Sequence, residues 1–150
     1  TIHKGLMICE AQSLDEVTIR IRSQGGRIHA GFDICDLIRQ YPGEVIGKVV
    51  TNAYSMGTVI LQACAKRIMT PNSHLLIHDA RTQVGLFSLT DEKKLKKIIK
   101  TLQEDQEKIQ SFLSARTGVS AKKMMPHMKK DKPIDAQTAK KLCLVDEISE

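Results

Sequence analysis

The amino-acid sequence predicts a single α/β domain in which helices cover a sheet. Its 150 residues are 41% hydrophobic and 27% charged, near the averages of globular proteins, which excludes a disordered or fibrous chain. Short runs of β-branched residues alternate with longer segments in which apolar residues recur at helical spacing. Strands that alternate with helices are typical of a layered α/β domain. No apolar run of the sequence approaches the ~18 residues that a membrane helix needs.

The first half of the chain alternates between helix and strand. Residues 17–22 place β-branched apolar residues between polar ones, as half-buried strands do, and Gly25 and Gly26 end this strand. The helix that follows is expected to end at Pro42. The elements expected here are helices over residues 2–11, 30–40 and 56–66 and strands over residues 17–22, 45–50 and 74–78.

A long helix over about residues 90–117 dominates the second half. Asp91 supplies an acidic start and Gly118 a stop. An apolar stripe runs between the dense charges of this helix, which favours burial by another subunit. The stripe consists of Leu95, Ile98, Ile99, Leu102, Ile109 and Phe112. The elements expected after it are helices near residues 120–129 and 135–142 and a strand over residues 145–148.

The four cysteines lie far apart in the sequence. They form no C-x-x-C pair, so a zinc ribbon or a redox dithiol is not expected. A chain of this length can bury a core without disulfides or metals. Scattered thiols are typical of reducing compartments, and we therefore expect a cytoplasmic protein. The cysteines are Cys9, Cys35, Cys64 and Cys143.

The net charge of +6 raises the question of nucleic-acid binding. Lysines gather in short clusters between residues 93 and 141, but aromatic residues are only 3% of the chain and none lies among these lysines. A stacking platform for single strands is therefore missing. The pattern favours solvated helix faces over a nucleic-acid partner.

Ser55 stands where a β-branched strand runs into a helix of small residues. A sharp turn there would lift the hydroxyl out of the sheet, and Gly57 would let the chains approach closely. The N–H groups of the following helix would point at an oxyanion formed on this serine. The segment is not G-x-S-x-G, because Ala53 precedes the serine by two. Taken alone, Ser55 is either a nucleophile or a helix cap.

His78 and the pair Gly25-Gly26 add to this pattern. His78 ends an apolar strand, from which its imidazole would reach a serine at the end of a neighbouring strand as general base. The alternative is a hydrogen-bonded structural histidine. Two glycines directly after a strand would free a backbone N–H to point into a groove, with a plain turn as the alternative.

Together these motifs resemble the proteolytic subunit of the Clp protease (ClpP) and its relatives, including phage head-maturation proteases. Residues 23–31 look like the family's S-P-G-G-x-x-x-x-G, and residues 54–57 are similar to its A-S-M-G turn around the nucleophile. Residues 71–78 closely resemble its P-N-S-x-x-M-I-H segment. Residues 131–139 and 144–148 are similar to its D-R-x-x-S-A-x-E-A and G-L-V-D-x-I segments.

The resemblance implies a role for five residues. Ser55 would be the nucleophile, His78 the general base and Asp131 the carboxylate that orients the base. The backbone N–H groups of Gly26 and Met56 would form the oxyanion hole.

Three acids are candidates for the third member of this triad. Asp79 adjoins His78, but neighbouring strand residues point to opposite faces. Asp135 lies four residues after Asp131, and its place before Ala136 favours a helix cap. Asp131 lies where the family's third member would fall, and Asp135 stays open as its alternative.

The resemblance also implies a ClpP/crotonase-like layered fold of βαβ units, with the helix over residues 90–117 protruding as a handle. The implied activity is a serine endopeptidase that forms an acyl-enzyme, without a metal or bound cofactor. The implied assembly is a homo-oligomeric ring, which would take peptide or unfolded protein and could be fed by an ATP-dependent unfoldase. Residues 1–150 would form one peptidase domain that lacks the N-terminal part of the family's domain.

Two other interpretations of the same fold remain. One is a catalytically silent or structural ring subunit, although inert relatives usually lose the serine or the histidine and this chain keeps both. The other is a crotonase-type acyl-CoA enzyme, against which the Ser55 and His78 pair speaks.

Overall fold

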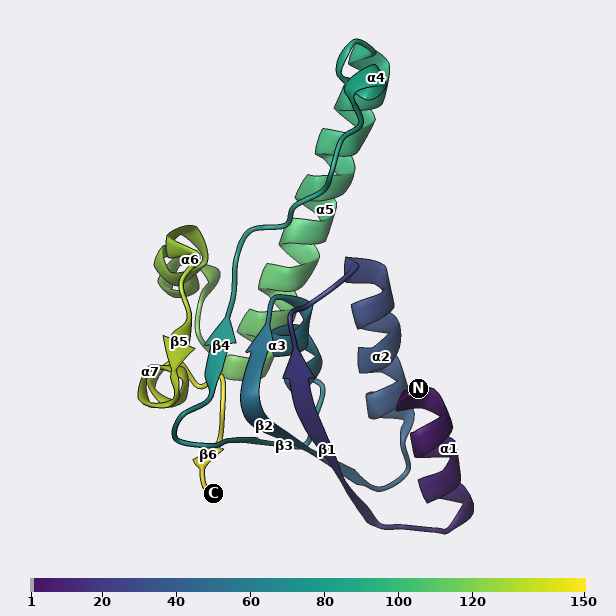
Figure 1. The fold of residues 1–150 in the computed structure, drawn as a ribbon, viewed down its shortest axis with the longest axis vertical. Coiled ribbons are helices and arrows are strands. Elements are labelled where there is room, and N and C mark those ends of the chain that lie inside the picture. Colours follow the sequence, from purple (N-terminus) through teal and green to yellow (C-terminus); the bar gives the residue numbers. More distant parts are fainter. Residues whose placement is uncertain (1) are drawn as a thin grey trace.

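The computed structural model describes residues 2–150 and shows a mixed α/β domain built on a six-stranded sheet (Figure 1). Helices α1 and α2 lie on one side of the sheet in this view, and α6 and α7 on the other. The elements are α1 (Ile2–Ala11), β1 (Glu16–Ser23), α2 (Ile28–Gln40), β2 (Glu44–Tyr54), α3 (Met56–Leu61), β3 (Lys66–Met69), β4 (His74–Leu76), α4 (Leu86–Leu89), α5 (Glu92–Thr117), α6 (Ala121–Lys130), β5 (Ile134–Asp135), α7 (Ala136–Lys141) and β6 (Glu147–Ile148).

Strand β2 is the centre of the sheet. It pairs in parallel with β1 along one edge, from Glu16 opposite Glu44 onwards. Its other edge pairs in parallel with β3 near its start and with β4 at its end, where Tyr54 lies opposite Leu76. The short β5 joins β4 in antiparallel register and β6 joins β3 in parallel. The carboxyl ends of β1, β2 and β4 therefore meet at the same edge of the sheet.

Two apolar clusters hold these layers together. The larger one joins the sheet to α3, α5, α6 and α7 and contains the fully buried Leu61, Leu75 and Leu113. The smaller one joins α1 and α2 to the start of β2 through residues such as Leu6 and Val45. Both consist of side chains that alternate along the strands or recur at helical spacing, as the sequence predicts.

Helix α5 extends well beyond the rest of the domain (Figure 1). Asp91 caps its start by accepting a hydrogen bond from the Lys94 N–H at 3.0 Å, and Gly118 ends it with φ 69°, so both predicted ends are confirmed. Residues 77–85 run alongside it toward its tip.

None of the helices in residues 2–150 combines the length and apolar character needed to cross a membrane.

The two halves of the apolar stripe on α5 behave differently. Ile109 is only 7% exposed and belongs to the chain's own core, where Phe112 packs edge-on against Phe32 with ring centroids 5.5 Å apart. The expectation that another subunit buries Ile109 is therefore wrong. Ile99, in the protruding half, leaves 53% of its surface exposed.

The region after α3 also differs from the prediction. The expected helix over residues 56–66 ends at Leu61, and β3 follows. The N–H groups of residues 62–64 bond to carbonyls three residues back, which tightens the last turn, and the Ala65 N–H donates to the Val45 carbonyl at 2.8 Å. The expected strand over residues 74–78 likewise ends at Leu76.

Hydrogen bonds made by Arg67 explain why the chain leaves α3 and enters strand β3 at this point. This side chain is 4% exposed and donates from Nε to Asp146 Oδ2 at 2.9 Å, while its Nη2 bonds to Oδ1 of the same carboxylate. Its Nη1 donates to Gln62 Oε1 at 2.6 Å and to the Cys143 carbonyl at 2.9 Å. The guanidinium therefore fastens the C-terminal turn to β3.

We expect Asp146→Asn to lower the free energy of unfolding by about 2 to 3 kcal/mol, because it leaves a buried guanidinium without its counter-charge. Urea denaturation measures this loss. Glu147→Gln is the matched control, since the ion pair of Glu147 with Lys66 is exposed on both sides. That variant should cost less than about 1 kcal/mol. Equal losses in the two variants would contradict the role of Arg67.

The same pair makes a prediction about pH. Burial opposes ionisation of Asp146, but hydrogen bonds from Arg67 and its positive charge outweigh burial and lower the pKa of this carboxyl. A carboxyl with a depressed folded pKa contributes stability that is complete above its unfolded value of about 4 and is lost as the pH falls through the folded value. The stability difference between wild type and Asp146→Asn should therefore be constant near neutral pH and shrink below about pH 4.

Candidate active site

Three connections meet where β1, β2 and β4 end. Residues 24–27 follow β1, Ser55 follows β2, and Ile77 and His78 follow β4. The Ser55 N–H donates to the Leu76 carbonyl at 2.7 Å and so joins two of these connections. Open α/β sheets bind ligands beyond the carboxyl ends of their parallel strands, which makes this edge the candidate site.

The backbone at Ser55 is strained. Its φ of 55° and ψ of −122° lie outside the regions that non-glycine residues usually occupy. The Thr58 hydroxyl supports the turn by donating to the Ala53 carbonyl at 2.6 Å. Ser55 occupies the N-cap position of α3, yet its side chain makes no capping hydrogen bond. Its hydroxyl is thus not used by the helix, which argues against a purely structural cap.

Two glycines let the neighbouring connections approach this turn. Gly25 has φ 97°, and a Cβ there would lie 2.6 Å from the Cβ of Ser55. A Cβ at Gly57 would lie 3.0 Å from the Cβ of Ser23. The first distance is too short for a real side-chain contact and the second is unusually tight, so the packing here requires glycine at position 25 and favours it at position 57.

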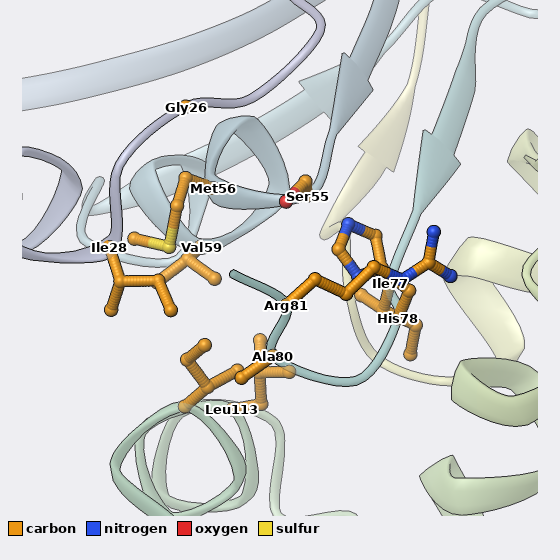
Figure 2. Close-up of a pocket in the computed structure, with 11 residues that line it drawn as sticks. Gly26, Ile28, Ser55, Met56, Val59, Ile77, His78, Ala80, Arg81 and Leu113 are labelled. Carbon is orange, nitrogen blue, oxygen red and sulfur yellow. The ribbon is translucent and has the colours of Figure 1, made fainter. Parts of the chain in front are cut away.

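A cavity of about 90 Å³ opens beside Ser55 (Figure 2). The picture places the Ser55 hydroxyl at the start of α3 on one side and His78 and Arg81 on the connection after β4 on the other. Apolar side chains from α2, α3, α5 and the connection after β4 line the remaining wall. These are Ile28, Val59, Ile77, Ile109 and Leu113.

Gly26 and Met56 bring backbone N–H groups to this cavity. Both residues line it next to Ser55. Met56 is the first residue of α3, where a helix has no internal acceptor for its N–H groups. Within residues 2–150, no acceptor is bonded to the Gly26 N–H. Neither N–H is therefore engaged in a hydrogen bond within the described residues.

His78 shares the cavity with Ser55 but is not hydrogen-bonded to it in this conformation. Its Nδ1 lies 2.6 Å from the carbonyl oxygen of Asp79. A carbonyl only accepts, so Nδ1 must carry the proton and donate it. In neutral His78 this leaves the lone pair on Nε2, which is the form a general base needs.

Asp131 lies at the end of α6, where it adopts φ 50°. Its Oδ2 accepts a hydrogen bond from Nη2 of Arg81 at 2.5 Å, and in this structure it makes none with His78. The hydrogen bond from Arg81 lowers the pKa of Asp131, and the charges of Arg81 and His78 lower it further. The carboxylate is therefore charged at neutral pH.

The other two acids have structural partners. Asp135 caps α7 by accepting from the Thr138 N–H at 2.8 Å, as its position in the sequence predicts. The Oδ1 of Asp79 accepts from Nε2 of Gln106 on α5 at 2.9 Å. Asp135 and Asp79 are thus held by other contacts, whereas Asp131 bonds to Arg81 on the connection that carries His78.

Sequence reasoning missed Arg81 and the apolar wall of the cavity. A basic residue three positions after His78 was the available signal for Arg81.

The cysteines offer no competing nucleophile in the core, because burial raises the pKa of Cys35 and of Cys64 to about 12. In the described part of the chain, no three His, Cys, Asp or Glu side chains gather to hold a metal ion.

The strained serine after a central strand, the histidine after its neighbour and the paired backbone donors agree with the resemblance found in the sequence. A sequence model of the Clp protease family matches residues 1–150, the whole chain. The mixed α/β architecture with its sheet and covering helices is consistent with that family's fold. The chain belongs to the Clp protease family.

Proposed function

We propose that this chain is a ClpP-like serine endopeptidase with Ser55 as nucleophile. The observation that carries the proposal is the strained turn that presents the Ser55 hydroxyl, unused by α3, to a cavity shared with His78. Strain of this kind costs about 1 to 3 kcal/mol and persists where the surrounding structure holds it for a function.

The reaction follows from the groups around the cavity. Nε2 of His78 takes the proton from the Ser55 hydroxyl as Oγ attacks the peptide carbonyl. The N–H groups of Gly26 and Met56 stabilise the negative oxygen of the tetrahedral intermediate. His78 then protonates the departing amine, and water releases the acyl group by the reverse sequence. The apolar wall formed by Val59 and Leu113 favours an apolar substrate side chain beside the bond that is cut.

Asp131 serves in this proposal as the carboxylate that stabilises charged His78. The Asp79 carbonyl already fixes the imidazole tautomer in this conformation. Asp131 therefore contributes chiefly through its charge, which Arg81 partly neutralises. Catalytic hydrogen bonds are often loose before substrate binds, and closure of His78 onto Ser55 belongs to the substrate-bound state.

Proteins of the Clp protease family generally assemble into oligomeric rings. We propose the same for this chain, with an ATP-dependent unfoldase as the source of unfolded substrate. The protruding half of α5 supports this, because it exposes Ile99 between charged residues with no cover from the chain's own core.

Ser55→Ala should abolish peptide cleavage, lowering kcat by at least about a thousandfold, since the nucleophile is lost. Folding should be unchanged, because the Ser55 side chain makes no cap hydrogen bond. Fluorophosphonate labelling followed by peptide mapping should place the adduct on Ser55 in wild type and give none in the variant. A variant that cleaves at the wild-type rate would overturn the assignment, and a wild type that neither cleaves nor reacts would indicate a silent subunit.

Asp131→Asn should lower kcat by about a hundredfold with little change in KM, because charged His78 loses its carboxylate while substrate contacts remain. Asp135→Asn is the matched control with the same change of charge. It should leave kcat within about twofold and lower the free energy of unfolding by about 1 kcal/mol, the cost of an N-cap. Exchanged phenotypes would assign the catalytic role to Asp135, and unchanged kcat in both would leave Ser55 and His78 as a dyad.

Ile99→Glu should dissociate the assembly, because it places a charge on an apolar face that a neighbouring copy covers. Ser111→Glu adds the same charge to an exposed site on the half of α5 that packs on the domain, and should leave assembly unchanged. Native mass spectrometry and sedimentation at micromolar concentration distinguish the two. A wild-type protein that is a fully active monomer would contradict the proposed ring.

A further inference from the structure

A second hollow continues from the cavity beside Ser55 along α5. It encloses about 420 Å³ and shares Gly26, Ile28 and Arg81 with that cavity. One wall is the chain from Gly26 to the start of α2, and the other is the face of α5 between residues 97 and 105. We call the two together the substrate groove, since a peptide held at Ser55 would extend into it.

The second hollow has an apolar lining that includes Ile28, Ile98 and Leu102, and most of the charged side chains along it are basic. Arg27, His29, Arg81 and Lys97 line it, against the single carboxylate of Asp105. Arg81 is paired with Asp131, as described above. Arg27 and Lys97 are exposed, and neither forms an ion pair within residues 2–150. Arg27 and Lys97 therefore line the groove without an ion-pair partner, and with Asp105 counted the groove keeps a net positive charge.

Other lysines of α5 are not placed in this way. Lys96 pairs with Glu92 at 2.6 Å and Lys100 pairs with Glu104 at 3.8 Å, so their charges are balanced along the helix. The Nζ of Lys108 lies 4.0 Å from the centroid of the Phe32 ring, and a cation–π interaction with that ring stabilises its charge. Of the lysines on α5, Lys97 is the one that both lines the groove and lacks an ion-pair partner.

We propose that the substrate groove selects peptides that carry an acidic side chain, aspartate or glutamate, a few residues from the bond that is cut. This inference rests on the proposed peptidase function. Lys97 precedes Ile109 by twelve positions, or about 18 Å along a helix. An extended peptide advances about 3.3 Å per residue. The cations therefore lie opposite substrate residues up to about five positions from the scissile bond.

The preference is expected to be moderate and sensitive to salt. The cations are exposed, so each contact with a substrate carboxylate gains up to about fivefold in affinity, and several contacts together about tenfold. Exposed charges are also screened by mobile ions within about 10 Å at 0.1 M salt. A strong preference for acidic peptides that did not change with salt concentration would not arise from these exposed cations.

The test compares two internally quenched peptides that are identical except for Glu or Gln at the third residue on each side of a central leucine. We expect kcat/KM to be about tenfold higher for the Glu peptide at low salt, and this ratio to fall toward one at about 0.5 M salt. Lys97→Glu should lower the ratio by about fivefold. Lys93→Glu, the same charge change outside the groove on the same helix, should leave the ratio unchanged.

A binding measurement separates this inference from the proposed function. Ser55→Ala protein is titrated against fluorescein-labelled Glu and Gln peptides, with anisotropy as the readout. Tighter binding of the Glu peptide, without cleavage of either peptide by wild type, would overturn the peptidase and keep the acidic preference. Cleavage of both peptides at equal kcat/KM, with equal binding, would overturn the acidic preference and keep the peptidase.

Discussion

The hydrogen bond from the Ser55 N–H to the Leu76 carbonyl is the contact on which the candidate site depends. It ties the end of β2 to the end of β4 at the point where the backbone of Ser55 enters a strained conformation. Thr58 holds the same turn from inside α3, and Gly25 and Gly57 let β1 close over it. Because these contacts come from three parallel strands and a helix, the serine is fixed relative to the sheet rather than to a flexible loop.

Arg81 links the chemistry of this site to the charge of its groove. It stands on the same connection as His78 and holds the carboxylate of Asp131 in an exposed ion pair. Such pairs contribute about 0 to 1 kcal/mol, so an acidic group arriving in the groove competes with Asp131 on nearly equal terms. In the proposed mechanism, a substrate carboxylate that displaced Asp131 from Arg81 would leave Asp131 free to stabilise charged His78.

The parts of the structure that follow from local sequence were predictable, and the parts that depend on distant partners were not. Asp91, Gly118 and Asp135 act on the first or last turn of their own helices, so their neighbours in sequence suffice. Ser55 and His78 were predicted to lie together because each follows a β-branched or apolar strand, and the structure places both on one cavity. The end of α3 was missed because Arg67 turns toward Asp146, 79 residues away. The contact of Asp131 with Arg81, 50 residues away, was missed for the same reason.

Helix α5 shows why the stripe on a long helix does not identify its partner. Ile109 and Leu113 pack into the domain and form part of the wall beside Ser55, whereas the half near Ile99 has little of the chain to pack against. On this exposed half, ion pairs such as Lys96 with Glu92 add only about 0.2 to 0.5 kcal/mol each to the stability of the helix. The groove is therefore packed against the domain's core where Ile109 lies beside Ser55, and it is more exposed toward Ile99. In the proposed mechanism, a substrate side chain beside the scissile bond would meet a buried apolar wall, whereas one several residues away would meet exposed cations, so the first would be selected by shape and the second by charge.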